Sequence, residues 1–103
     1  MFDIVAIGSA TRDIFLGIDS FKKIKSSDFA TGEGLCFPFG SKLEIKKIVF
    51  TSGGGGTNAA VTFSRQGLKT ACIGVVSNDL NGQELLNELA GEGIETKYFR
   101  KHD

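Results

Sequence analysis

The fold of this chain is decided by one stretch, Gly53-Gly54-Gly55-Gly56-Thr57-Asn58-Ala59-Ala60. The apolar residues 48–50 before it are typical of a strand, and residues 58–66 have the composition of a helix. Because the four glycines carry no side chains, a ligand can approach their backbone closely. A strand, a glycine loop and a helix N-terminus together predict a cradle of free N–H groups for an oxygen-rich ligand. The alternative is a flexible turn or linker, whose flanks would be polar.

The composition is that of a globular protein with no bias towards polyanionic partners. The chain has 103 residues, of which 41% are hydrophobic and 23% charged, and its 12 basic and 12 acidic residues cancel. This balance predicts no attraction to nucleic acid or to anionic lipid. No apolar run approaches the length of a membrane span, and the first residues lack the basic region of a signal peptide. With two isolated cysteines, Cys36 and Cys72, we expect a cytoplasmic protein with reduced thiols.

The first half of the chain has strand-like patterns around a long irregular segment. A continuous apolar run at residues 3–8 predicts a strand buried on both faces, as in a parallel sheet. Residues 13–19 alternate between apolar and polar, which predicts a half-buried strand. Residues 21–40 have no clear period, so we expect a long loop there. The alternation at residues 43–50 changes parity, and a bulge near residues 46–47 would reconcile the two registers.

The second half alternates regularly between helix and strand patterns. We predict a helix at residues 57–66 that Gly67 ends, followed by a strand at residues 69–76. Asp79 can cap a second helix, and a further strand is expected at residues 96–100. The apolar stripe of the second helix consists of Leu85, Leu86, Leu89 and Ala90. This βαβαβ order implies parallel crossovers, and two helices cover so little of a sheet that we expect the N-terminal part of a longer α/β protein.

A second polar constellation, residues 8–13, follows the first predicted strand. Ligands of open α/β sheets bind at the carboxyl ends of the strands, so this segment and the glycine loop should converge there. The hydroxyl of Thr11, the carboxylate of Asp13 and the amide of Asn58 suit a neutral polyol. Alternatively, Asp13 is a turn acid and Asn58 an N-cap residue. Arg12 is expected at the surface, facing away from Asp13.

Two known phosphate-binding motifs have glycine loops of a similar kind. A Walker A loop needs Gly-Lys followed by Ser or Thr, and the chain contains no such sequence. The spacing of Gly54, Gly56 and Ala59 satisfies a loose dinucleotide fingerprint between a strand and a helix. That fingerprint belongs in the first βα turn, whereas a long excursion precedes this one, and Asp79 comes late for its acidic residue. A dinucleotide-binding α/β fragment therefore remains an alternative.

The sequence resembles the N-terminal portion of a ribokinase-like, PfkB-type carbohydrate kinase. Four features in a specific order carry the resemblance: residues 5–9 with Asp13, residues 53–60, residues 70–76 and residues 79–82. The resemblance implies an α/β fold, a parallel sheet with flanking helices plus a small β lid. Residues 1–103 would then form the N-terminal part of one domain. Within it, residues 14–50 match the lid, and residues 1–13 and 51–103 match the core.

Members of this family phosphorylate a sugar, nucleoside or related hydroxyl compound with ATP and Mg²⁺. The resemblance assigns substrate contacts to Thr11, Asp13, Gly53, Gly54, Gly55, Gly56 and Asn58. Thr11 stands where ribokinases have Asn and Gly55 where they have Lys, so ribokinase specificity is not implied. The lid closes over the substrate and often dimerises, and its apolar residues Ile14, Leu16 and Ile18 predict a homodimer through the lid sheet.

One departure from the family decides what this chain can do by itself. The family's catalytic base is an Asp in a Gly-Ala-Gly-Asp-like motif near the C-terminus, and no Gly-x-Gly-Asp occurs here. The segments that bind ATP and Mg²⁺ are also missing, so phosphoryl transfer lacks its base and its electrostatics. We therefore expect the substrate-binding part of a kinase, inactive alone, with its general base beyond residue 103. A non-catalytic polyol-binding module is the alternative.

Overall fold

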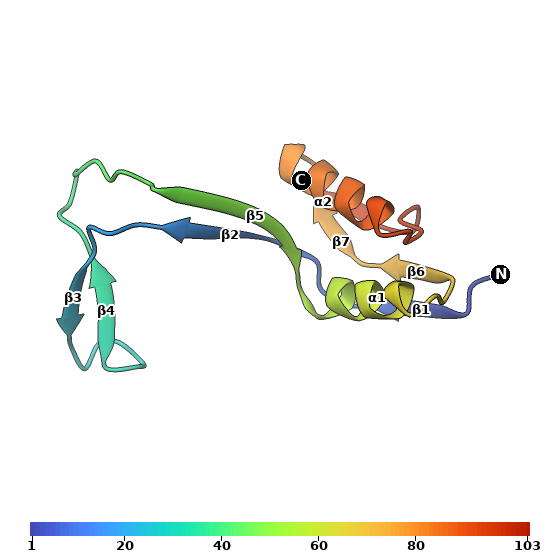
Figure 1. Ribbon diagram of the computed structural model, residues 1–103, viewed down its shortest axis with the longest axis horizontal. Helices are drawn as coiled ribbons and strands as arrows, with labels where there is room; N and C mark the ends of the chain where they lie inside the picture. The colour runs from blue at the N-terminus through green and yellow to red at the C-terminus, as the bar shows by residue number, and fades with distance from the viewer. The chain divides into compact units, whose positions relative to one another are not determined.

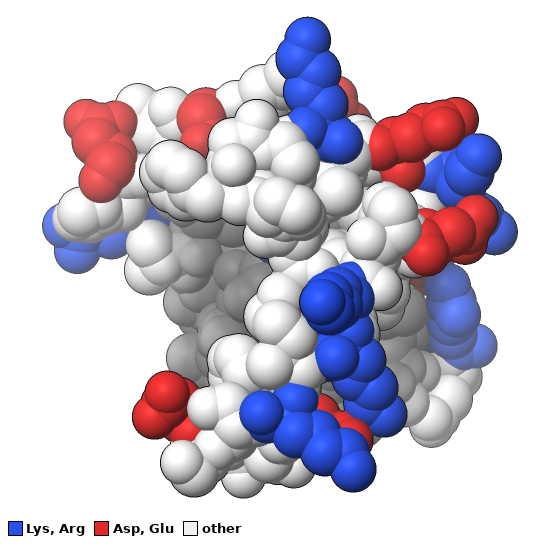
Figure 2. All heavy atoms as spheres, turned by 90° about the vertical axis from the view of Figure 1, so that its left-hand side faces the viewer, with Lys and Arg blue, Asp and Glu red and all other residues white.

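The computed structural model describes residues 1–103, and its contacts divide the chain into two compact units. The core unit consists of residues 1–13 and 50–103, and the hairpin unit consists of residues 14–49. Positive and negative side chains share the face seen in Figure 2, in keeping with the net charge of zero. None of the helices combines the length and the apolar character needed to cross a membrane.

The core unit is built from parallel strand pairs and two helices (Figure 1). Strand β1 (Ile4–Ile7) pairs in parallel with β6 (Thr70–Ile73). Strand β7 (Val75–Ser77) pairs in parallel with β8 (Arg100–His102). Parallel neighbours need a crossover connection, and α2 (Leu80–Gly91) provides it between β7 and β8. The predicted α/β class with parallel strands and flanking helices is therefore confirmed.

Helix α1 (Gly55–Arg65) begins two residues earlier than predicted. Its N-cap is Gly54, whose φ of 96° lies in the left-handed region that favours glycine. The alternative assignment of Asn58 as the N-cap is therefore wrong, because Asn58 lies in the first turn of the helix. At the other end, Gly67 follows with a φ of 87°, and the predicted helix stop is confirmed.

Asp79 caps α2 as predicted. Its Oδ1 accepts a hydrogen bond from Gly82 N at 2.9 Å and another from Ser77 Oγ at 2.6 Å. The Ser77 hydroxyl, more than the Gly82 amide, holds the pKa of Asp79 below its ordinary value. This cap fixes the turn that joins β7 to α2.

Two predicted strands of the second half differ from the observed ones. The strand expected at residues 69–76 is divided into β6 and β7, because Gly74 interrupts it and its carbonyl accepts a bond from Arg100 N. The strand expected at residues 96–100 begins only at Arg100. Residues 96–99 instead form a turn in which Phe99 N donates to Thr96 O at 3.1 Å.

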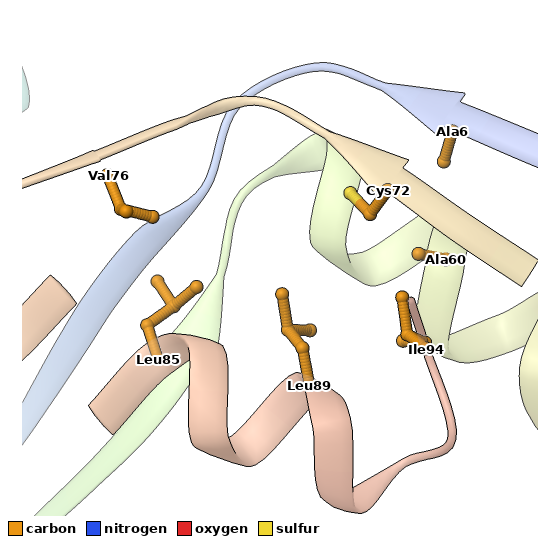
Figure 3. Packing of buried hydrophobic residues seen from close by; sticks show 7 residues of the cluster. All are labelled: Ala6, Ala60, Cys72, Val76, Leu85, Leu89 and Ile94. Atoms are coloured by element: carbon orange, nitrogen blue, oxygen red, sulfur yellow. The ribbon is translucent and has the colours of Figure 1, made fainter. Parts of the chain in front are cut away.

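The apolar core lies between the strands and the two helices (Figure 3). In that view Leu85 and Leu89 of α2 point towards the strands, where Val76 lies opposite them. Burial raises the pKa of the Cys72 thiol. Ala90, predicted in the apolar stripe, is exposed. The buried apolar side chains of the cluster are Ala6, Ala60, Cys72, Val76, Leu85, Leu89 and Ile94.

The opposite face of the strands is open. Val5 is 44% and Ile7 76% exposed, whereas Ala6 between them is buried. The prediction that β1 is buried on both faces is therefore wrong for this chain. The reason is that both helices contribute side chains to the same cluster, so no helix of the core unit covers the other face.

The hairpin unit contains an antiparallel pair where the sequence predicted a loop. Strand β3 (Lys22–Lys25) pairs with β4 (Glu33–Cys36), and Lys23 Nζ lies 2.9 Å from Glu33 Oε2. Between the strands Gly32 has a φ of 79°, which closes the turn. The prediction of a long loop at residues 21–40 is thus wrong for the two strands, and the residues between and after them are turns and irregular segments. Lysines fill most of β3, so its period of two was not visible in the apolar residues.

Strands β2 (Thr11–Gly17) and β5 (Lys47–Gly53) form another two-stranded sheet, and the boundary between the units passes through both strands. β2 begins two residues before the predicted strand at residue 13. Leu43 and Ile45 lie outside any strand, so the predicted strand at these positions is wrong. Lys46 N donates to Gly17 O at 2.8 Å, directly before β5 begins.

The core makes a testable prediction about α2. Leu89 is fully buried in the cluster, so Leu89→Ala should lower the free energy of unfolding by about 2–5 kcal/mol. Leu80→Ala, on the same helix but at a position 75% exposed, should change it by less than about 0.5 kcal/mol. Urea unfolding followed by circular dichroism measures both. Similar losses for the two variants would contradict the assigned core.

Candidate functional site

Thr11 and Asp13 lie at the start of β2, directly after the turn that follows β1. Residues two apart on a strand face the same side, and Thr11 Oγ1 donates a hydrogen bond to Asp13 Oδ1 at 2.9 Å. The other carboxylate oxygen, Oδ2, faces Gly53: a Cβ added to Gly53 would collide with it and lie 2.8 Å from Thr11 Oγ1. The predicted site residues Thr11, Asp13 and Gly53 are therefore brought together.

Ser9 organises the start of α1. Its carbonyl accepts hydrogen bonds from Gly56 N at 3.0 Å and Thr57 N at 3.4 Å, and its hydroxyl accepts one from Gly55 N at 3.0 Å. The first helical N–H groups are therefore already satisfied by the protein itself. The predicted cradle of free N–H groups for a ligand is wrong, because the turn after β1 supplies their acceptors.

Ser9 was not among the predicted site residues, although it belongs to the constellation at residues 8–13. The sequence signal for its role was a small hydroxyl residue in the turn directly after a predicted parallel strand. Such a residue can cap the N-terminus of a helix. Sequence alone gave no reason to prefer Ser9 to Thr11 for contact with the glycine loop.

Three of the four consecutive glycines are required by close packing. A Cβ at Gly54 would lie 2.5 Å from Ser9 O, and one at Gly56 would lie 2.7 Å from Gly8 C. Gly53 faces side-chain atoms of Thr11 and Asp13 instead. Gly55 differs, because its nearest neighbour would be Ser9 Oγ at 3.9 Å, an ordinary contact. The loop is thus fixed at three positions and open at one.

Asn58, another predicted site residue, has hydrogen bonds within its own helix. Its N–H donates to Gly54 O at 2.9 Å, and its carbonyl accepts from Thr62 Oγ1 at 2.9 Å. No hydrogen bond joins Asn58 to Thr11 or Asp13. The residue lines a cleft of about 310 Å³, and this cleft is further lined by Thr51, Ser52, Val61, Thr62, Arg65, Glu88 and Glu92.

One wall of this cleft is an ion pair between the two helices. Arg65 Nε and Nη2 donate to the two carboxylate oxygens of Glu92, at 2.9 and 2.5 Å. The hydrogen bonding from Arg65 holds the pKa of Glu92 below its ordinary value.

Arg12 is the neighbour of Asp13 on β2, a strand in which successive side chains alternate between the two faces. Its guanidinium carbon lies 5.0 Å from the centroid of the Phe50 ring, a cation–π contact. The prediction that Arg12 is a surface residue is only partly right. The side chain is half-buried, and its Nε is buried without a hydrogen-bond partner.

The geometry offers a hydrogen-bond acceptor to a ligand that donates hydrogen bonds. The carboxylate of Asp13 lies beside Thr11 and Gly53. An ionised carboxylate accepts hydrogen bonds and donates none. No group of three or more His, Cys, Asp and Glu side chains comes together in the chain. The residues present therefore do not form a cage for a divalent metal ion.

The family model for pfkB carbohydrate kinases matches residues 1–103, the whole chain. The chain belongs to the pfkB family of carbohydrate kinases. The family match therefore includes all the residues on which the resemblance in the sequence rested. No curated protein matches it significantly.

Solved structures share the fold of this pfkB chain. An Arabidopsis thaliana ribokinase, solved with ribose and ATP, matches with a TM-score of 0.71 and 23% identity over 94% of the chain. A Thermotoga maritima ribokinase matches with a TM-score of 0.68 and 19% identity over 100% of the chain. A Methanocaldococcus jannaschii nucleoside kinase matches with a TM-score of 0.66 and 15% identity over 96% of the chain. The pfkB chain spans 27–29% of the length of these proteins, and the likeness shows a ribokinase-like fold.

The packing of the glycine loop predicts that replacing a glycine by alanine has a different effect at each of positions 53, 55 and 56. Gly56→Ala should lower the free energy of unfolding by about 1–3 kcal/mol, because its Cβ meets the backbone of Gly8. Gly53→Ala should cost less, because it meets side-chain atoms that can rotate, but it should displace the Asp13 carboxylate. Gly55→Ala serves as the control and should be neutral or stabilising by up to about 1 kcal/mol.

Thermal unfolding measures the stability of the three variants, and the side-chain carboxyl ¹³C shift of Asp13 reports its displacement. An unmoved Asp13 signal in Gly53→Ala would show that Gly53 does not pack on the carboxylate. Equal stability losses in all three variants would show that the loop has no special packing at any position.

Proposed function

We propose that this chain is the substrate-binding part of an ATP-dependent kinase that phosphorylates a hydroxyl group of a sugar or nucleoside. One observation carries the proposal: the Asp13 carboxylate, hydrogen-bonded by Thr11, lies against the bare backbone of Gly53 in a pfkB-family chain. The location beside the end of β1 supports it, because open α/β sheets bind ligands at the carboxyl ends of their strands.

Each proposed contact follows from the chemistry of its group. Asp13 Oδ2 accepts hydrogen bonds from substrate hydroxyls, while Thr11 holds Oδ1 and so orients the carboxylate. The substrate would approach the backbone at Gly53, beside the carboxylate, and at the open position Gly55, while Gly54 and Gly56 hold the loop against residues 8–9. Asn58 on the first turn of α1 would contribute an amide. The proposed substrate-binding set is Thr11, Asp13, Gly53, Gly54, Gly55, Gly56 and Asn58.

Phosphoryl transfer needs further groups. We propose that the general base and the sites for ATP and Mg²⁺ are contributed by a portion of the enzyme beyond residues 1–103. The presence of ribose and ATP in the related Arabidopsis structure supports the use of ATP. Free cysteines, Cys36 and Cys72, support a reducing compartment such as the cytoplasm.

The geometry also bears on the alternatives. A dinucleotide-binding loop presents the N–H groups of a helix N-terminus to a pyrophosphate. Here Ser9 occupies the N–H groups of Gly55, Gly56 and Thr57, which argues against that alternative. A non-catalytic polyol-binding module would use the same carboxylate, and an activity measurement separates it from a kinase.

The proposed activity predicts the effect of removing the carboxylate. In the full-length protein, Asp13→Ala should lower kcat/KM by about 2–4 kcal/mol, or roughly 30- to 1000-fold, because substrate hydroxyls lose a charged acceptor. Asp19→Ala, an exposed acid in the same region, is the matched control and should retain full activity. ADP release is measured with a panel of pentoses, hexoses and nucleosides, and folding is checked by thermal melts.

Three outcomes are distinguishable in this experiment. Turnover that depends on Asp13 supports the kinase, and binding of a panel member without turnover supports the polyol-binding module. Turnover by residues 1–103 alone would contradict the proposal that the base lies elsewhere. Normal kcat/KM in a stable Asp13→Ala variant would assign Asp13 to the turn instead of the site.

We further propose that the protein is a homodimer through the β2–β5 sheet, and that residues 14–50 act as a lid. Ile14, Phe15 and Leu16 are all exposed on β2, so the strand presents apolar side chains on both sides. Exposed apolar groups of this kind are stabilised by contact with a substrate, with a second sheet or with both.

Leu16→Lys should therefore weaken the dimer, because a charge would be buried in an apolar contact. Ser27→Lys, an exposed position in the turn between β3 and β4, is the control and should leave it intact. Sedimentation velocity at micromolar concentration measures both. A monomeric parent refutes the dimer, and a dimer that tolerates Leu16→Lys has its interface elsewhere.

A further inference from the structure

We infer that Glu88 of α2 is a positioning residue for the candidate site: it fixes the end of β5 so that Gly53 stays against the Asp13 carboxylate. Glu88 comes 75 residues after Asp13 in the sequence and does not belong to the proposed substrate-binding set. The inference rests on the proposed function only for its consequence in catalysis, because the contact itself is a property of the fold.

One carboxylate oxygen of Glu88 receives all the bonds. Its Oε1 accepts from Ser52 N at 3.2 Å, from Ser52 Oγ at 3.2 Å and from Thr51 Oγ1 at 3.5 Å. Hydrogen bonds to an ionised acceptor are stronger than those between neutral groups. Because the backbone N–H and the side chain of Ser52 bind the same oxygen, the orientation of this residue is fixed at two points.

Ser52 directly precedes the position where the site is tightest. A Cβ on Gly53 would overlap the Asp13 carboxylate, so the backbone at Gly53 lies as near to this group as packing allows. A change in the backbone at Ser52 therefore moves Gly53 relative to Asp13. On the other side of the loop, Ser9 holds Gly55 and Gly56. The glycine loop is thus anchored before Gly53 by Glu88 and after it by Ser9.

The neighbouring acids of Glu88 do not share its contact with β5. The carboxylate of Glu92, the C-cap residue of α2, is bound by Arg65, so it does not compete for Ser52. Glu88 is half-buried, and Glu84, one turn earlier on the same helix, is exposed and makes no side-chain hydrogen bond. Glu84 is therefore a matched control with the same residue type and helix.

The test compares Glu88→Ala, Glu88→Gln and Glu84→Ala in the full-length protein without ligand. Glu88→Ala should accelerate amide hydrogen exchange at Ser52 by roughly tenfold or more, the factor that corresponds to a lost charged hydrogen bond. It should also shift the Asp13 side-chain carboxyl ¹³C signal. Glu88→Gln keeps an acceptor oxygen, so the exchange rate at Ser52 and the Asp13 signal should stay close to those of the parent. Glu84→Ala should change neither quantity.

Unchanged exchange at Ser52 in Glu88→Ala overturns the anchor. Faster exchange with an unmoved Asp13 signal overturns the positioning role and leaves only a local contact. Loss of all protected amides in Glu88→Ala shows a global folding defect; in that case Ser52→Ala, which removes one bond, provides the same two readouts. Phosphorylation assays of the parent test the proposed kinase separately, since the exchange measurements need no substrate.

If the parent is active, Glu88→Ala should lower kcat/KM and Glu88→Gln should recover it, without a matching pattern in thermal stability. Equal kcat/KM in Glu88→Ala and the parent would limit the role of Glu88 to the ligand-free structure and contradict its positioning function.

Discussion

The hydrogen bonds of Ser9 are the constraint on which the site depends. A helix leaves its first N–H groups without partners, and at the start of α1 these groups find their acceptors on one residue of the turn after β1. Two segments separated by more than forty residues are thereby joined backbone to backbone. The glycines at 54 and 56 follow from this contact, because side chains at either position would separate the segments.

The same contact also changes the chemistry that the candidate site offers. A helix N-terminus with free N–H groups attracts anions, but at α1 that capacity is used within the protein. The remaining charged group is the carboxylate of Asp13, which attracts hydrogen-bond donors. The polar character of the site is therefore opposite to that of a phosphate-binding loop, although the sequences of the two loops look similar.

Much of the fold could be predicted from the sequence, because local signals and long-range packing agreed there. The order of helices and strands in the second half, the Asp79 cap and the Gly67 stop all have causes within a few residues. Predictions were wrong where the outcome depended on distant partners. The lysine-rich strand β3 forms only because β4 pairs with it. The N–H groups at the start of α1, which the sequence predicted to be free, are bound by Ser9, 46 residues from Gly55. For the site, the sequence indicated Thr11, Asp13 and the glycines, but the separate setting of Asn58 required the structure.

Gly55 has a consequence for how such a loop can change over evolutionary time. Substitutions at its neighbours would disrupt either the backbone contact with residues 8–9 or the placement of the Asp13 carboxylate. At Gly55 a side chain meets only an ordinary contact, so variation there is nearly free of folding penalty. A loop with one permissive position among fixed ones can acquire new side-chain chemistry beside the candidate site while its scaffold stays constant. Such single substitutions would not pass through unstable intermediates.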